Sequence, residues 1–155
     1  MKIPSKVIIA GIEFKVQMKK FLASGENSVT YGESHYNLKE ILIAKNKEMY
    51  TRNEREFLPV LHNENVKTFY HELWHMICMI TEMDAINDEV NAEMFGLLCG
   101  NEMFRNIDDI SVPVCHSLMK NVTLDMRKAG LISVKQEAIV DLCIRCIDFK
   151  WDTKE

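Results

Sequence analysis

Two histidines and a glutamate in the segment TFYHELWHMI, residues 68–77, form the pattern in this chain that is best suited to catalysis or metal binding. His71 and His75 stand four residues apart, and Glu72 directly follows the first histidine. Residues at positions i and i+4 of an α-helix share one face, so the two imidazoles can bind one Zn²⁺ from adjacent turns. Glu72 lies about 100° further around the helix, where its carboxylate can reach a water on the metal. The pattern predicts a catalytic zinc centre with its own general base.

The residues around this pattern are almost all apolar. Between Thr68 and Ile80, no proline and no charged residue other than Glu72 interrupts the segment. A helix that is apolar on nearly all sides belongs in a protein core, and polar side chains buried there need polar partners. A metal ion would supply such a partner for both histidines.

A catalytic zinc usually has three protein ligands and one open position. A metzincin would continue with glycine at position 78 and histidine at position 81, but this chain has Cys78 and Thr81. That branch is excluded, which leaves a glutamate from a later element as the expected third ligand.

Four glutamates follow the motif closely enough to be considered: Glu82, Glu89, Glu93 and Glu102. Glu82 belongs to the end of the motif helix, and Glu102 lies late in the next helix. Glu89 and Glu93 are i and i+4 in the first half of that next helix, so both can face the histidines. One of them can ligate the metal while the other holds a ligand histidine.

The elements that must position these residues begin with strands. KVIIAGIEFKVQM is rich in β-branched residues and predicts two short strands, or one strand bent at Gly11. A short strand is expected at Val29–Tyr31, inside a turn-rich segment, and the apolar run EILIAKN predicts another.

Helices are expected after these strands. From Thr51 onward, apolar residues recur three and four positions apart, with Pro59 near a helix boundary. The motif helix should run from about Asn65 to Thr81, and Asn87 or Asp88 should cap the next helix. Two more helices are predicted in VPVCHSLMKNVTLDMRKAG and SVKQEAIVDLCIRCIDFKW, with Gly130 as a stop and Ser133 as a cap. Strands followed by helices indicate an α+β fold, with a small N-terminal sheet packed on the helices.

The composition excludes several classes of protein. The chain has 155 residues, 47% of them hydrophobic, which is typical of one domain with a proper core. A formal net charge of −4 argues against charge-driven binding of nucleic acid, and no apolar run approaches the ~18 residues needed to span a membrane. Five irregularly spaced cysteines are typical of reduced thiols in a cytosol, and Cys143 and Cys146 are better explained as helix residues than as zinc ligands.

HELWH followed by NDEVNAEMFGLL resembles the gluzincin-type metallopeptidase domains of the ImmA/IrrE family and related small proteins of phages and prophages. The resemblance covers residues 5–105 and includes YGESHYNLKEILIAKN, which is similar to the edge strand of that family. It implies Glu89 as the third zinc ligand and Glu93 as a support for a ligand histidine or as an alternative ligand. We therefore expect a minimal zincin-like domain over residues 1–106. Residues 107–155, which have no counterpart in that family, are expected to form a C-terminal helical extension packed on the same domain.

Three further residues are candidates for stabilising the transition state. Tyr31 and Tyr36 lie near the expected edge strand and could donate to an oxyanion, and His116 could do so from the C-terminal region. The edge strand itself, expected within Tyr36–Asn46, would hold an extended peptide by strand addition.

The sequence therefore predicts a cytoplasmic zinc metallopeptidase that acts on a peptide or protein substrate. A regulatory protein in a phage or mobile-element setting, in the host cytosol, is the substrate that the resemblance implies. The alternative is a non-catalytic protein-binding module with the same fold and structural zinc or none. A DNA-associated protease of the SprT-like kind fits less well, because it would use a third histidine and a basic surface.

Overall fold

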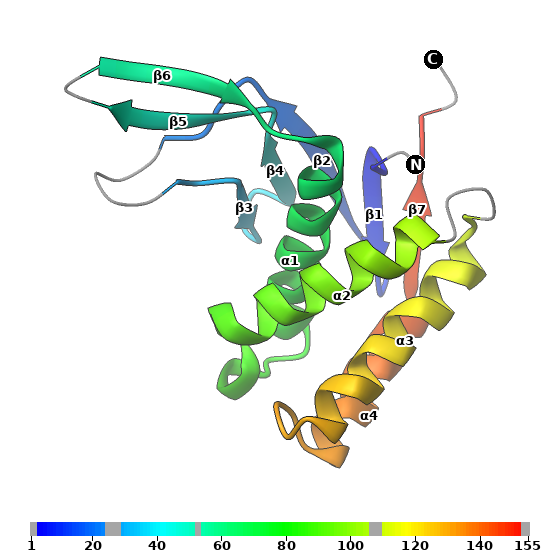
Figure 1. The fold of residues 1–155 in the computed structure, drawn as a ribbon. Coiled ribbons are helices and arrows are strands. Elements are labelled where there is room, and N and C mark those ends of the chain that lie inside the picture. Colours follow the sequence, from blue (N-terminus) through cyan, green and yellow to red (C-terminus); the bar gives the residue numbers. More distant parts are fainter. Residues whose placement is uncertain (1–2, 24–28, 52–53, 106–109, 153–155) are drawn as a thin grey trace.

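The computed structural model describes residues 3–23, 29–51, 54–105 and 110–152, with backbone alone for 49–51, 54 and 55. These residues form the predicted α+β fold (Figure 1), with a mixed five-stranded sheet, a separate two-stranded sheet and four α-helices. The strands are β1 (Lys6–Ile9), β2 (Ile12–Lys19), β3 (Gly32–His35), β4 (Glu40–Ala44), β5 (Asn46–Thr51), β6 (Glu54–Pro59) and β7 (Ile147–Lys150). The helices are α1 (His62–Ile80), the short 3-10 helix η1 (Asp84–Ile86), α2 (Glu89–Arg105), α3 (Val112–Lys128) and α4 (Val134–Arg145).

The N-terminal hairpin confirms the prediction of two short strands. β1 and β2 pair antiparallel around Ala10 and Gly11, whose φ angles are +50° and +82°. Positive φ at both central residues is the conformation of a type I′ turn, which matches the natural twist of paired strands. Glycine adopts it without steric cost, so Gly11 marks the turn.

The main sheet has the strand order β3-β4-β2-β1-β7. β2 and β4 run parallel, with Val16 opposite Ile41, and the remaining neighbours are antiparallel. β4 therefore lies inside the sheet, and the expectation of an exposed edge strand within Tyr36–Asn46 is wrong. The edge strand on this side of the sheet is β3, which lies a little later in the chain than the strand expected at Val29–Tyr31.

The C-terminal helix is shorter than its periodicity suggested. α4 ends at Arg145, and the following residues form β7, which pairs with β1 so that Val7 faces Phe149. Ile147 and Phe149 are buried. This segment is a strand because alternate side chains are buried when it pairs with β1. β1 lies about 140 residues earlier in the chain.

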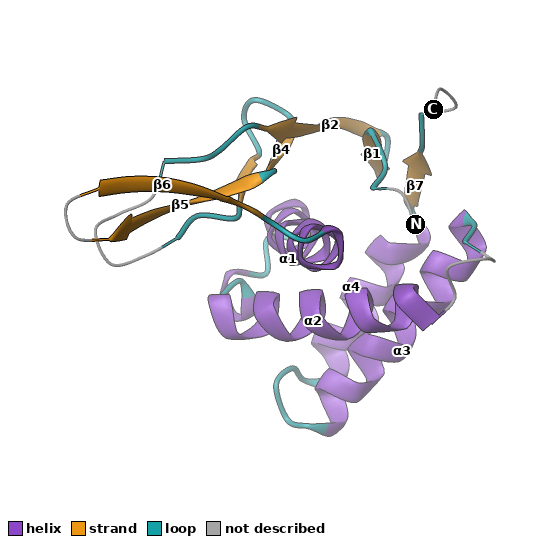
Figure 2. Ribbon diagram, turned by 45° about the horizontal axis from the view of Figure 1, so that its top comes forward, coloured by secondary structure: helices purple, strands orange, loops and turns teal. Residues whose placement is uncertain are grey.

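A second correction concerns residues 46–59. Residues 46–51 and 54–59 form β5 and β6, an antiparallel pair that projects from the body of the molecule (Figure 2). The apolar spacing from Thr51 suggested a helix. Pro59 instead ends β6, at a strand terminus where a missing N–H donor is tolerated.

α1 is the central element of the core. It packs against β3 and β4 on one side and against α2 on the other. Leu73, Trp74, Met76 and Ile77 are fully buried on it. The Trp74 indole donates to the carbonyl of Ile86 at 3.0 Å, which fixes the connection between α1 and α2.

The helix ends follow local signals in the sequence. Asp88 accepts a hydrogen bond from the Asn91 amide at 2.7 Å at the start of α2. Ser133 caps α4 in a reciprocal capping box with Gln136. Gly130, after α3, has a φ of +78°, the left-handed conformation expected of a helix stop.

Among the described residues, no helix combines the length and hydropathy that a bilayer crossing requires.

Candidate metal centre

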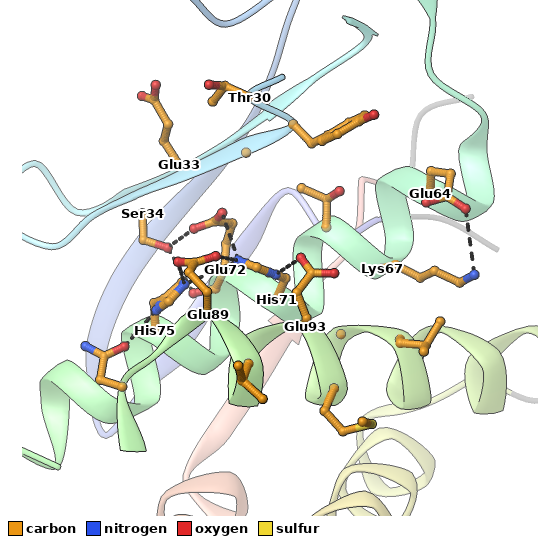
Figure 3. Close-up of a pocket in the computed structure, with 18 of the residues that line it drawn as sticks. Thr30, Glu33, Ser34, Glu64, Lys67, His71, Glu72, His75, Glu89 and Glu93 are labelled. Carbon is orange, nitrogen blue, oxygen red and sulfur yellow. Dashed lines mark hydrogen bonds and ion pairs between the residues drawn. The ribbon is translucent and has the colours of Figure 1, made fainter. Parts of the chain in front are cut away.

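α1 presents both motif histidines toward α2 and a cleft, as Figure 3 shows. His71 and His75 stand one turn apart, and their side chains are 13% and 16% exposed. The apolar residues around them hold the rest of α1 in the core, so the two rings sit at the floor of the cleft rather than on a free surface. Rigid placement of this kind is what a metal site needs.

Glu89 reaches the same point from the first residue of α2. Its Oε2 lies 3.1 Å from His71 Nε2, and its Oε1 lies 3.1 Å from His75 Nε2. The two Nε2 atoms are 3.3 Å apart. Three ligand atoms from two helices thus converge, and His71, His75 and Glu89 could hold a metal ion.

The separation of the two ring nitrogens suits a tetrahedral ion. Tetrahedral zinc binds nitrogen and oxygen at about 2.0–2.1 Å, which places neighbouring ligand atoms about 3.3 Å apart. The two Nε2 atoms are 3.3 Å apart, and each lies 3.1 Å from a different oxygen of Glu89. The two imidazoles and one Glu89 oxygen could therefore supply three ligands to such an ion.

The other ring nitrogens indicate which atoms carry protons. His71 Nδ1 lies 2.7 Å from Glu93 Oε1, and His75 Nδ1 lies 2.7 Å from Asn87 Oδ1. A carboxylate oxygen and an amide oxygen only accept hydrogen bonds, so a neutral ring carries its proton on Nδ1. The Nε2 lone pairs then face each other and Glu89 with no proton between them. A cation relieves the repulsion in this arrangement, and such outer partners are typical of metal-binding histidines.

Glu72 lies between this cluster and the sheet. Its Oε1 is 3.9 Å from His71 Nε2, and the Ser34 hydroxyl on β3 is hydrogen bonded to its Oε2. The side chain is only 8% exposed. Burial raises the pKa of Glu72 above its ordinary value, while the hydrogen bond from Ser34 and the nearby histidines act in the opposite direction. A carboxylate tuned in this way is suited to exchanging protons.

The cleft above the cluster has a volume of about 1200 Å³. Residues 29–35, which include β3, form one wall, and residues of α1 and α2 form the floor and the other wall. The apolar side chains of Val90, Met94 and Leu97 lie along the α2 wall.

The structure brings together most, but not all, of the residues singled out from the sequence. Tyr31 lines the cleft, whereas Tyr36 packs against Phe14 with its ring centroid 6.1 Å away and does not line it. His116 is also elsewhere: its Nε2 lies 2.6 Å from the carbonyl oxygen of Ile147, where it joins α3 to β7.

Sequence reasoning missed two residues of the site, Ser34 and Asn87. Asn87 was considered only as a helix cap, although its position two residues before Glu89 places it beside a ligand on the returning chain. Ser34 carries no local signal at all, because its contact with Glu72 spans 38 residues.

The fold and the side chains thus define an α+β protein with a candidate metal centre of two histidines and one glutamate. No family model matches the sequence, and neither a curated protein nor a solved structure matches the chain.

We expect metal binding to stabilise the protein measurably. Free Zn²⁺ at one hundred times its dissociation constant should add about 2.7 kcal/mol of stability, which raises the Tm of a chain this size by about 5–10 °C. His75→Ala should remove this shift, while His62→Ala, at the exposed start of the same helix, should keep it. Differential scanning calorimetry with and without zinc measures both. If zinc raised the Tm of the His75→Ala variant by the same amount, the ion would bind at another site.

Proposed function

We propose that this protein is a zinc-dependent peptidase. The observation that carries the proposal is the convergence of the His71 and His75 Nε2 atoms with the Glu89 carboxylate, with the Glu72 carboxylate beside them. Neutral imidazole and carboxylate suit zinc, and three protein ligands with one open position are the pattern of its catalytic sites. The resemblance of the motif to ImmA/IrrE-type peptidases points in the same direction.

A bound zinc ion would acidify a water molecule and polarise the carbonyl of the scissile bond. Glu72 takes one proton from the attacking water as the oxygen bonds to the carbonyl carbon. The same carboxyl group then delivers that proton to the nitrogen of the departing amine as the C–N bond breaks. Each turnover thus consumes one water and one peptide bond, and Glu72 returns to its ionised form.

The partners of the histidines keep this chemistry aligned. Glu93 and Asn87 accept from the Nδ1 atoms and would so keep both Nε2 atoms directed at a bound ion. Tyr31 on the cleft wall is a candidate donor to the developing oxyanion. Tyr36 and His116 have no such role in this proposal because neither lines the cleft.

The edge strand β3 provides a means to hold an extended peptide. Among the residues that the structure describes, it pairs with β4 alone, and it forms the wall of the cleft directly above the cluster. A peptide added along the free side would gain main-chain hydrogen bonds with little dependence on sequence. Its scissile bond would then lie over the ligand atoms of α1 and α2.

The proposal predicts peptide hydrolysis that depends on zinc. Protein stripped with a chelator and reloaded with one equivalent of Zn²⁺ should cleave members of an unstructured peptide pool, detected by mass spectrometry. The stripped protein and zinc-treated His75→Ala should not. If the reloaded wild type binds zinc but cleaves no peptide or protein, the chain is better explained as a binding module with the same fold.

The charges around the cleft predict a substrate preference. Glu33, Glu64 and Glu93 line it in addition to Glu72 and Glu89, while Lys67 is the one lysine or arginine among its described lining residues. We expect peptides with lysine or arginine near the cleaved bond to have about tenfold higher kcat/KM than matched glutamate peptides at low salt. The difference should shrink in 0.5 M salt, where the screening length falls to about 4 Å. Equal rates for both peptide sets would contradict it.

A further inference from the structure

β3 approaches α1 unusually closely at the level of Glu72. A Cβ placed on Gly32 would lie 2.5 Å from Thr68 Cγ2 and 3.0 Å from Glu72 Cγ. Only a glycine fits this contact without displacing its neighbours. The close approach brings the next inward-facing residue of the strand, Ser34, directly against the Glu72 side chain.

Ser34 contacts Glu72 at two points. Its hydroxyl lies 3.0 Å from the Glu72 carbonyl oxygen and within hydrogen-bond distance of Oε2. The other carboxylate oxygen, Oε1, is the one that lies 3.9 Å from His71 Nε2. Ser34 therefore ties down one oxygen of Glu72 and leaves the other directed at the metal position.

We propose that Ser34 is a positioning residue for the Glu72 carboxylate. This inference rests on the proposed function, in which Oε1 accepts the proton of the attacking water. The last side-chain torsion of a glutamate has a broad energy minimum, so the torsion alone does not fix the carboxylate. Without the Ser34 hydrogen bond, the Glu72 carboxylate would rotate more freely. Loss of alignment at the base lowers the rate of proton transfer without removing the base.

The two contacts also suit a residue that alternates between charged and neutral forms. Toward ionised Glu72, the Ser34 hydroxyl donates its single proton to Oε2. When Oε1 carries the proton from water, the Ser34 hydroxyl can keep donating to Oε2 or turn its proton to the Glu72 carbonyl oxygen. No heavy atom has to move between the two states.

A purely architectural role for the Ser34 hydroxyl is less well supported. β3 is already held to β4 by paired residues at Gly32, Glu33, Ser34 and His35. The strand therefore keeps its place in the sheet when the hydroxyl is removed, and the effect of its loss should fall on Glu72.

Ser34→Ala tests the proposal, with Ser34→Thr as the conservative variant. Ser5→Ala is the matched control, because the Ser5 hydroxyl also donates to a backbone carbonyl, that of Lys150, at the opposite end of the same sheet. We expect Ser34→Ala to lower kcat about 10–100-fold, the range found for partners of metal-site residues. KM and zinc affinity should stay close to wild type, Ser34→Thr should recover most of the rate, and Ser5→Ala should lose none. An unchanged kcat in Ser34→Ala, or a parallel loss of zinc, would overturn it.

A second measurement separates this inference from the proposed function. Acetohydroxamate is a zinc chelator whose acidic proton needs an acceptor when it binds, so its affinity for the zinc-loaded protein should depend on the position of the Glu72 carboxylate without turnover. Zinc-loaded Ser34→Ala should bind it several-fold more weakly than wild type and Ser5→Ala by calorimetry. Equal affinity in all three proteins would overturn the role of Ser34 even if peptides are cleaved. Weaker binding in Ser34→Ala alone would support it even if no peptide is cleaved.

Discussion

Glu72→Gln is expected to lower kcat by about 10²–10⁴-fold, the contribution of a general acid–base group. Glutamine has the size and shape of glutamate but cannot take a proton from water or deliver one to the leaving amine. The candidate ligand atoms belong to His71, His75 and Glu89, so under the proposed function the variant should still bind one zinc ion. Steady-state hydrolysis and metal content measured on the same preparation test both parts.

The matched control is Glu64→Gln, an isosteric change at another cleft carboxylate on the same helix. Glu64 is 53% exposed and lies 3.7 Å from the Lys67 ammonium, remote from the proton transfer. It should retain nearly full kcat. Full activity in Glu72→Gln would remove the general base from the mechanism, and loss of zinc would show that Glu72 is needed to form the metal centre.

Gly96→Ala is expected to disrupt the contact between α1 and α2 and with it the metal centre. An added Cβ would lie 2.6 Å from the Lys67 carbonyl oxygen and 3.0 Å from His71 Cβ and N. Backbone atoms cannot rotate away, so the helices must separate. Overpacking of this kind costs about 1–3 kcal/mol, which exceeds the gain of up to about 1 kcal/mol in helix propensity. A displacement of about 1 Å between His71 and Glu89 can cost about 10²-fold in activity.

Gly100→Ala, one turn further along α2, is the control. Its Cβ would meet Lys67 Cγ at 2.5 Å, but the nearest backbone atom is 3.4 Å away. A lysine side chain can move, so this variant should keep its stability, zinc affinity and activity. Thermal unfolding and zinc titration of both variants decide the matter. Equal behaviour of the two would mean that helix separation does not control the site.

The main parts of the candidate site could be predicted from the sequence because they are local. The spacing of His71 and His75 places both rings on one face of any helix, whatever surrounds it. The spacing of Glu89 and Glu93 likewise placed both carboxylates on one face of α2, but it could not separate their roles. The coordinates separate them: Glu89 faces the two Nε2 atoms, and Glu93 faces Nδ1 of His71.

Two of the sequence predictions failed because strand pairing decided the conformation or the position of the segment. β7 looked like the end of a helix, and its conformation depends on pairing with β1. β4 looked like an edge strand, and it is covered because β3 adds outside it. Local periodicity describes which faces of a segment are apolar, but it contains no information about which strand lies beside it.

The sequence by itself determined the N-terminal hairpin, the motif helix and the residues able to supply ligand atoms. Those properties follow from bonds and torsions within a few residues of each other. Only the tertiary structure decided which glutamate completes the triad, which strand forms the wall of the cleft, and that a serine 38 residues away is hydrogen bonded to Glu72. Those contacts depend on how close two separately formed elements pack. In this protein that distance is set by glycines, Gly32 between β3 and α1 and Gly96 between α1 and α2.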